Sequence, residues 1–321
     1  MKLGLFTALL HEKKLEECFP LFRELGVEAL EFSTGPLTPQ HHIDMDALLE
    51  NPSACEALQR TLKEQGFSIS ALNCAGNPVH PDPDIARVHH AFFEKTVRLA
   101  ELLGVEVVIC FSGCPGGAPG ERTPNWICCP WPEEYLAMRE YQWNDVLIPY
   151  WWDAAALAAR HGVAKIALEM HPGFCVYNPE TLLRLRAQTG DAVGANFDPS
   201  HLVWQGIDLY EAVLRLSGCI YHVHAKDTFV NHRVVRETGN IDAKHYDDPT
   251  ARAWTFCTVG TGAGLDAWRR MMTALRYTGY DGAVSMEHED MLMSRAEGLR
   301  KAAKFLGDVM IREPSEGMWW A

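Results

Sequence analysis

Short apolar runs alternate along this chain with longer segments in which apolar residues recur every three or four positions. The short runs are typical of buried parallel strands, and the longer segments are typical of amphipathic helices. Strands are predicted at residues 2–6, 27–32, 68–72, 105–111, 164–170, 193–197, 220–224 and 282–287. Helices are predicted at residues 13–25, 53–65, 83–103, 133–161, 179–188, 208–217, 265–277 and 293–308. Eight strands in strict alternation with eight helices predict an α/β fold, a (β/α)8 TIM barrel.

The alternation runs without a visible domain boundary. Residues 1–321 contain no domain linker, low-complexity tract or heptad run, so we expect a single TIM-barrel domain. The competing fold, a doubly wound open sheet, normally has a glycine-rich turn after its first strand. Here that turn reads FTALLHEKK at residues 6–14, which favours the barrel.

Two connections are longer than an ordinary turn between a strand and a helix. Residues 112–132 follow the fourth predicted strand, and residues 228–262 follow the seventh. Connections of this length in a compact domain are usually functional. Since both follow strands, we expect them at the carboxyl end of the barrel, where enzymes of this fold carry their active sites.

Four consecutive predicted strands end in a carboxylate or an imidazole: Glu169, Asp198, His224 and Glu287. A closed barrel would bring these strand ends to one point. A buried charge without a partner costs several kcal/mol, and Lys226 is the main cation near these positions. A divalent metal ion would satisfy all four side chains, and carboxylate oxygens with one imidazole suit Mn²⁺, Mg²⁺ or Co²⁺. The alternative is a network of salt bridges without a metal.

These residues, together with DPSH at 198–201 and HVHAKD at 222–227, resemble the xylose isomerase-like TIM barrels of the sugar phosphate isomerase/epimerase superfamily. The resemblance covers nearly the whole chain. It implies that Glu169, Asp198, His224 and Glu287 hold one divalent ion. We expect this ion to be Mn²⁺, with Mg²⁺, Co²⁺ and Zn²⁺ as the alternatives. It further implies that Glu169 and Glu287 form the catalytic acid/base pair, and that the protein is a homo-oligomer, either a dimer or a tetramer.

The chemistry of this ligand set agrees with that implication. Moving a proton next to a carbonyl needs a base on one face of the carbon, an acid on the other, and an electrophile for the enediolate oxygen. We therefore expect a metal-dependent isomerase or epimerase of a sugar or keto-sugar, acting through a metal-bound enediolate. A lyase that dehydrates an inosose or eliminates from a 3-oxo-glycoside would begin with the same proton abstraction. Glu289 is the rival of Glu287, because two positions along an extended strand share one face.

Five further residues are candidates for binding the substrate, and each has a structural alternative. His201 lies three residues after Asp198, and His171 lies two residues after Glu169. His80 belongs to a polar turn after the third strand, and Trp126 in the 112–132 connection could stack on a sugar ring. Lys226 could bind a substrate hydroxyl or could simply pair with Asp227. The alternatives for the histidines are helix caps and hydrogen-bonded rim positions.

Charge and composition narrow the class of partner. The 42 acidic and 29 basic residues give a formal net charge of −13, which disfavours a nucleic-acid surface and an anionic membrane surface. A nuclease resembling endonuclease IV is disfavoured as well, since the 228–262 connection lacks an Asp-x-His pair. Ten scattered cysteines and the lack of a signal sequence or an apolar span predict a cytoplasmic enzyme with reduced thiols and a small-molecule carbohydrate substrate. A barrel that only binds sugar is disfavoured by the four-residue ligand set.

One glycine-rich stretch invites a different interpretation. VGTGAG at residues 259–264 looks like a phosphate-binding loop, but it lacks the Lys-Ser/Thr ending and a preceding buried strand. We interpret it as the turn that leads into the helix at 265–277. A substrate phosphate could still bind at the N-terminus of that helix.

Overall fold

The computed structural model describes residues 1–320, in which eight parallel strands close into a barrel. Neighbouring strands follow the order β1-β10-β7-β6-β5-β4-β3-β2, and β2 pairs with β1 to close the ring. The predicted (β/α)8 TIM-barrel fold is thus confirmed. The barrel strands are β1 (Lys2–Phe6), β2 (Ala29–Ser33), β3 (Ser68–Cys74), β4 (Val107–Phe111), β5 (Lys165–Glu169), β6 (Val193–Phe197), β7 (Ile220–Ala225) and β10 (Ala283–Met286).

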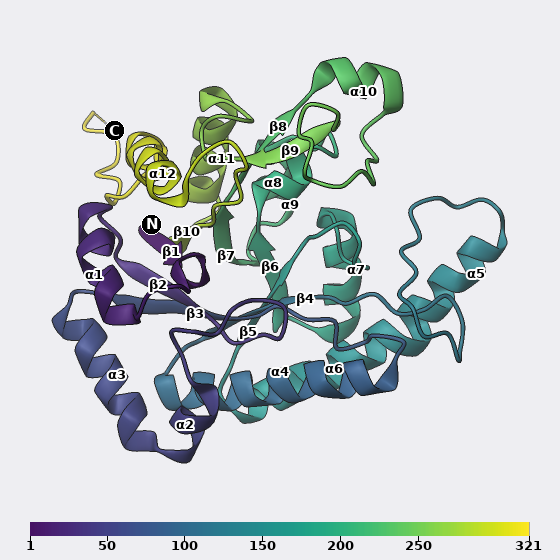
Figure 1. The fold of residues 1–321 in the computed structure, drawn as a ribbon, viewed down its shortest axis with the longest axis horizontal. Helices are drawn as coiled ribbons and strands as arrows, with labels where there is room; N and C mark the ends of the chain where they lie inside the picture. The colour runs from purple at the N-terminus through teal and green to yellow at the C-terminus, as the bar shows by residue number, and fades with distance from the viewer. Residues whose placement is uncertain (321) are drawn as a thin grey trace.

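Helices surround the strands on the outside, as Figure 1 shows for α4 and α6 beside β4 and β5. The α-helices are α1 (Leu15–Glu24), α2 (Met45–Glu50), α3 (Pro52–Glu64), α4 (Pro83–Leu103), α5 (Glu134–Glu140), α6 (Ile148–Arg160), α7 (Pro179–Thr189), α8 (Pro199–Val203), α9 (Leu209–Arg215), α10 (His232–Thr238), α11 (Leu265–Tyr277) and α12 (Arg295–Val309). A 3-10 turn, η1 (Thr7–Leu10), follows β1.

The sequence determines the ends of α4 through its capping residues. Asp82 accepts a hydrogen bond from the backbone N–H of Asp84, and Pro83 occupies the first helical position, where its missing N–H leaves no gap. Gly104 ends the helix with a φ of +60°, a left-handed conformation that glycine adopts without steric cost. The helix predicted at residues 83–103 therefore has the predicted bounds.

Several regions differ from the prediction. The short helices α2 and α8 were not predicted, and two longer segments fold differently. The long connection after β7 folds into an antiparallel hairpin of β8 (Asp227–Val230) and β9 (Trp254–Cys257), with α10 between the two strands. The helix predicted over 133–161 consists of α5, a wider π-helical stretch at Tyr141–Leu147 labelled η2, and α6. The connection at 112–132 contains no helix or strand, as predicted.

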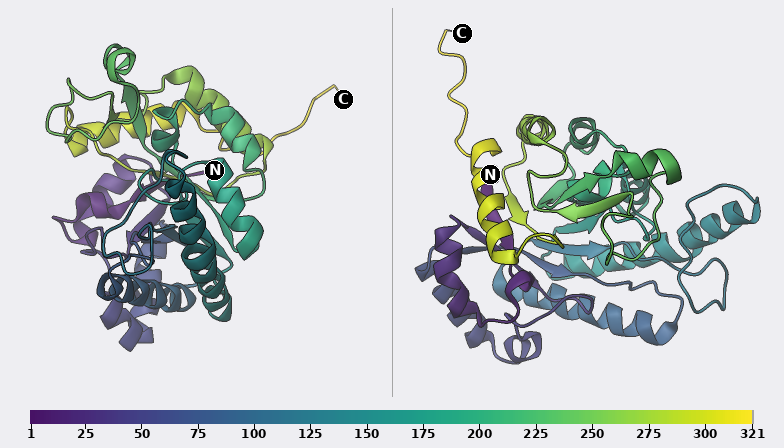
Figure 2. Two further views of the ribbon diagram at one scale, coloured as in Figure 1. Left: turned by 90° about the vertical axis from the view of Figure 1, so that its right-hand side faces the viewer. Right: turned by 45° about the horizontal axis from the view of Figure 1, so that its top comes forward.

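The parallel strands all point the same way, so their carboxyl ends gather at one end of the barrel. The hairpin and α10 lie beyond this end in Figures 1 and 2, and the last residues extend away from the barrel in both views of Figure 2. All ten cysteines are free thiols, and seven of them are buried. Within residues 1–320, no helix has the length and apolar content needed to cross a membrane.

Candidate metal and proton-transfer centre

The four strand ends singled out by the sequence meet at the carboxyl end of the barrel. Glu169 is the last residue of β5, Asp198 follows β6, His224 lies in β7 and Glu287 follows β10. Nδ1 of His224 lies 3.1 Å from Oε2 of Glu169 and 3.2 Å from Oε2 of Glu287. Asp198 caps α8 through the N–H of Ser200 with one oxygen, which leaves its Oδ2 facing the centre. The structure therefore brings all four predicted metal ligands together.

Lys226 lies inside this centre and is almost fully buried. Its Nζ is 3.0 Å from Oε2 of Glu287 and 3.3 Å from Oδ2 of Asp198, and it lies 4.8 Å from the centre of the Phe256 ring. Asp227 takes no part in this arrangement, because its carboxylate points into the turn before α11. The alternative interpretation, in which Lys226 simply pairs with Asp227, is therefore wrong.

The geometry separates Glu287 from Glu289. Glu287 contacts His224 directly, whereas Oε2 of Glu289 reaches only Lys226, at 3.7 Å. The side chain of Glu289 is 47% exposed, against 12% for Glu287. Glu289 thus forms part of the rim, and Glu287 is the residue placed among the candidate ligands.

Two of the predicted substrate-binding histidines lie beside the centre. Nε2 of His201 is 3.0 Å from Oε1 of Glu169 and 3.4 Å from Oδ2 of Asp198. The ring of His171 lies 4.1 Å from that of His201, centre to centre. Burial, followed by the neighbouring His201, lowers the pKa of His171 to about 3, so His171 is a neutral group at physiological pH.

The other two candidates lie in different surroundings. Nδ1 of His80 accepts a hydrogen bond from the backbone N–H of Asp82, at the turn that starts α4. Trp126 packs edge-on against Tyr177. The hollow beside the centre measures about 640 Å³ and is lined by His171, Tyr246, Thr255, Phe256, His288, Glu289, Asp290, Met291 and Arg295. Neither His80 nor Trp126 belongs to that wall.

Sequence reasoning missed the layer of polar residues beneath the centre. Glu31 on β2 is fully buried, and its carboxylate lies 3.0 Å from Nε2 of His224. Asn196 on β6 donates a hydrogen bond from its side-chain amide to Oε2 of Glu169. Its Oδ1 lies within hydrogen-bonding distance of Nδ1 of His222. A signal was present, because Glu31 is a carboxylate near the end of an apolar strand, as Glu169 is.

The charges at the centre do not balance. Burial opposes ionisation, yet His201 and His224 hold the pKa of Glu169 well below its ordinary value, and Lys226 with His224 lowers that of Glu287 to about 2. Burial likewise opposes the charges of Lys226 and His224, but the surrounding carboxylates raise both pKa values well above the ordinary ones. For Asp198, burial raises the pKa to about 6 despite Lys226. The carboxylates outnumber the two cations.

The same side chains fit a divalent cation. Oδ2 of Asp198, Nδ1 of His224 and Oε2 of Glu287 are buried, and among residues 1–320 none of these atoms has a partner in hydrogen-bonding geometry. The ligand atoms of these three residues lie within 4.8 Å of one another, as do those of the group formed by Glu169, Asp198 and His201. Two carboxylates and an imidazole facing one point, with negative charge in excess, form a donor set for a metal ion.

The glycine-rich turn at 259–264 encloses a protein carboxylate. Asp227 accepts hydrogen bonds from the backbone N–H groups of Gly260, Gly262 and Ala263 and from Nε1 of Trp268. Four donors that would suit a phosphate are therefore already satisfied. The stretch is the turn leading into α11, as predicted, and the place of an anion at this turn is taken by Asp227.

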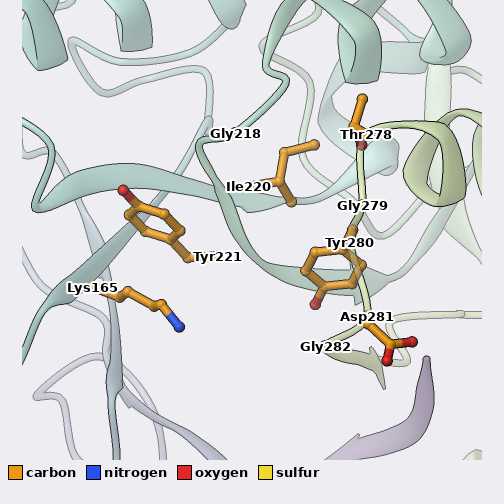
Figure 3. A pocket seen from close by; sticks show the side chains of 9 residues that line it. All are labelled: Lys165, Gly218, Ile220, Tyr221, Thr278, Gly279, Tyr280, Asp281 and Gly282. Carbon is orange, nitrogen blue, oxygen red and sulfur yellow. The ribbon is translucent and has the colours of Figure 1, made fainter.

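A second hollow lies at the opposite end of the barrel (Figure 3). Its wall includes Lys165 and Ile220, the first residues of β5 and β7, and Gly282, which precedes β10. These positions are at the amino ends of the strands. The residues that line this hollow include none of the predicted site residues.

Comparison with known proteins agrees with this architecture. The chain is 39% identical over 308 residues to the uncharacterized protein YfiH of Bacillus subtilis. This alignment covers 95% of this chain and 98% of YfiH. Among solved structures it is similar to 3-keto-D-glucoside 4-epimerase YcjR from E. coli, with a TM-score of 0.64 and 16% identity over 96% of this chain and 99% of that one.

Two further solved structures have the same fold. The probable 3-DHS dehydratase AsbF from Bacillus anthracis has a TM-score of 0.65 and 17% identity over 96% of this chain and 99% of that one. The IolI protein, solved with a bound zinc atom, has a TM-score of 0.64 and 21% identity over 96% of this chain and 98% of that one. The family model of the xylose isomerase-like TIM barrel matches residues 19–309. The chain therefore belongs to the xylose isomerase-like TIM barrel family.

Proposed function

We propose that this protein is a divalent-metal-dependent isomerase or epimerase that moves a proton on a carbon next to the carbonyl of a sugar or keto-sugar. The observation that carries the proposal is the approach of Glu169 and Glu287 to one point from β5 and β10, with β6 and β7 between them in the barrel. Two carboxylates that reach one centre from different sides can serve opposite faces of a carbon atom. YcjR is a 3-keto-D-glucoside 4-epimerase and IolI was solved with a bound zinc atom, and both support metal-dependent epimerase chemistry on this fold. AsbF is a probable dehydratase and supports the lyase as the alternative.

The surroundings of Glu169 suit it to accept a proton. Asn196 donates to one of its oxygens and His201 contacts the other, so the carboxylate is held in one orientation. His201 and His224 hold the pKa of Glu169 well below its ordinary value against the effect of burial, so the side chain is ionised and has a free oxygen lone pair for a proton. Glu287 would deliver a proton to the opposite face of the carbon after receiving one from substrate or solvent.

Lys226 and the wall of the hollow would orient the substrate. The ammonium group of Lys226 can donate to a carbonyl or hydroxyl oxygen while it stays paired with Glu287. His171 and Phe256 line the hollow beside it, and as a neutral ring His171 can accept or donate a hydrogen bond. When a divalent ion is bound by Glu169, Asp198, His224 and Glu287, it supplies the positive charge that binds substrate oxygens and stabilises the charge developed on proton removal.

The test is proton exchange in D₂O. Protein stripped with a chelator and reloaded with Mn²⁺ would be incubated with a panel of keto-sugars and 3-oxo-glycosides and followed by NMR. We expect deuterium to enter at the carbon next to the carbonyl together with the appearance of an epimer or isomer. Metal-free protein is the control. Loss of water or of an aglycone would identify the lyase, and a panel without exchange or product would contradict both reactions.

A further inference from the structure

Glu31 lies behind His224, at the ring nitrogen that faces away from Glu169 and Glu287. It belongs to β2, and its side chain is fully buried. The register between β2 and β3 shifts between Leu30 and Glu31, so that Ser70 is left without a partner in the ladder. Such an irregularity re-aims the side chains around it. Here Glu31 points into the barrel beneath the metal and proton-transfer centre.

Neutral donors from two strands anchor this carboxylate. Oε1 of Glu31 accepts a hydrogen bond of 2.8 Å from Nδ2 of Asn73 on β3. Oε2 accepts one of 2.7 Å from Oγ of Ser285 on β10. Both oxygens also lie within hydrogen-bonding distance of Nε2 of His224, at 3.0 and 3.1 Å. Asn73 and Ser285 therefore hold the carboxylate rigidly against one nitrogen of the imidazole.

The opposite nitrogen of His224 is the one that faces the centre. With Nε2–H donating to Glu31, Nδ1 points at Glu169 and Glu287. A rotated ring would turn a C–H group toward Glu31 and leave its two oxygens without the imidazole donor. The Phe6 ring stacks on the imidazole at 6.3 Å, which further restricts rotation.

We propose that Glu31 is a positioning residue that fixes the orientation and tautomer of His224, so that Nδ1 is the atom offered to the metal ion. This inference rests on the metal site of the proposed function and deepens it. A carboxylate behind a histidine ligand orients the ring and increases the basicity of the metal-binding nitrogen. Glu169 and Glu287 cannot do this, because both contact the imidazole at Nδ1.

The first test is metal affinity, which requires no substrate. Glu31→Gln keeps the size of the side chain and removes its charge. We expect the dissociation constants for Zn²⁺ and Mn²⁺ to rise about 10- to 100-fold, as substitutions behind metal ligands typically do. Ser285→Ala, which removes one anchor and leaves Glu31 in place, should shift affinity in the same direction by less. If Glu31→Gln fails to fold, the metal affinity of Ser285→Ala tests the proposal in its place. Unchanged affinity in a folded Glu31→Gln protein would overturn the proposal.

A second measurement reports the tautomer directly. In ¹⁵N-histidine-labelled protein loaded with Zn²⁺, His224 should show a protonated Nε2 and a metal-bound Nδ1. Metal bound at Nε2 would contradict the role of Glu31. Asp227→Asn is the matched control, since Asp227 is another buried carboxylate fully engaged in hydrogen bonds. It should lower the melting temperature without altering the His224 signals. Because neither readout involves turnover, a failure here is distinguishable from a failure of the proposed reaction.

Discussion

The proposed function gives Glu169 and Glu287 two separable tasks, holding a metal ion and moving a proton. Glutamine retains a ligand oxygen but cannot take up a proton. We therefore expect Glu169→Gln and Glu287→Gln to remain about 10²- to 10⁴-fold slower in turnover even when enough Mn²⁺ is added to restore occupancy. Steady-state kinetics at measured metal occupancy would show this. Near-normal turnover in either saturated variant would remove that residue from the catalytic pair and make Glu289 the next to test.

Lys226 is the ammonium group on which the buried carboxylates depend in the absence of a metal. Replacing it by methionine leaves Asp198 and Glu287 without that partner. Removing one member of a buried ion pair costs about 3–5 kcal/mol, whereas an exposed pair contributes about 1 kcal/mol or less. We expect Lys226→Met to lower the melting temperature strongly in metal-free protein and less after loading with metal.

Lys165→Met is the matched control for this measurement. The ammonium group of Lys165 pairs with Glu106 at 2.9 Å on the protein surface. Calorimetry of both variants with and without metal gives the comparison. Two outcomes would show that the ammonium group does not compensate the carboxylates. One is equal destabilisation of the two variants, and the other is a decrease in the melting temperature of Lys226→Met that is the same with and without metal.

Whether a single site residue could be predicted from the sequence depended on its position in its strand. Glu169, Asp198, His224 and Glu287 were predictable because each ends or follows an apolar run. The role of Glu31 was not, since its partners Asn73, His224 and Ser285 come from three other strands, and no local pattern shows that these residues contact Glu31. Local patterns identify strand ends, but a second layer of contacts becomes visible only once the barrel is closed.

Among the elements, the turn around Asp227 has little room for a side chain. A Cβ on Gly262 would lie 2.3 Å from the carbonyl oxygen of Thr228, so Gly262→Ala must displace the turn from the Asp227 carboxylate. We expect this variant to unfold at a lower temperature. Gly307→Ala is the control, because Gly307 lies within α12 with nothing within 4 Å of its Cβ position, and alanine favours the helix by about 1 kcal/mol. Equal melting temperatures for both variants would contradict the tight turn.

The regular elements were predictable to within a few residues, and the irregular ones were not. Apolar spacing with Pro83 and Gly104 as boundary residues fixed α4 from the sequence. The hairpin of β8 and β9 escaped prediction because its strands pair across the intervening α10 and carry polar as well as apolar residues. The π-helical stretch at Tyr141–Leu147 has ordinary helical residues, so its wider turn has no sequence signature that we recognised.

On the scale of the whole molecule, the centre draws its parts from both ends of the chain. Glu31 and Ser285, which share a hydrogen bond, are 254 positions apart, and Glu31 and His224 are 193 apart. The closing pairs β1–β10 and β10–β7 place these residues together. The site is therefore a property of the closed barrel and of no single segment.

This separation has a consequence for folding kinetics. Contacts between distant positions form late, because the loop entropy must be overcome before they stabilise the chain. A metal ion would then find its complete site only after the rate-limiting barrier. We expect Mn²⁺ added during refolding to leave the folding rate unchanged and to slow unfolding, since it stabilises only the native state. Stopped-flow refolding and unfolding with and without metal would check this, and faster refolding would indicate that the ligands assemble before the barrel closes.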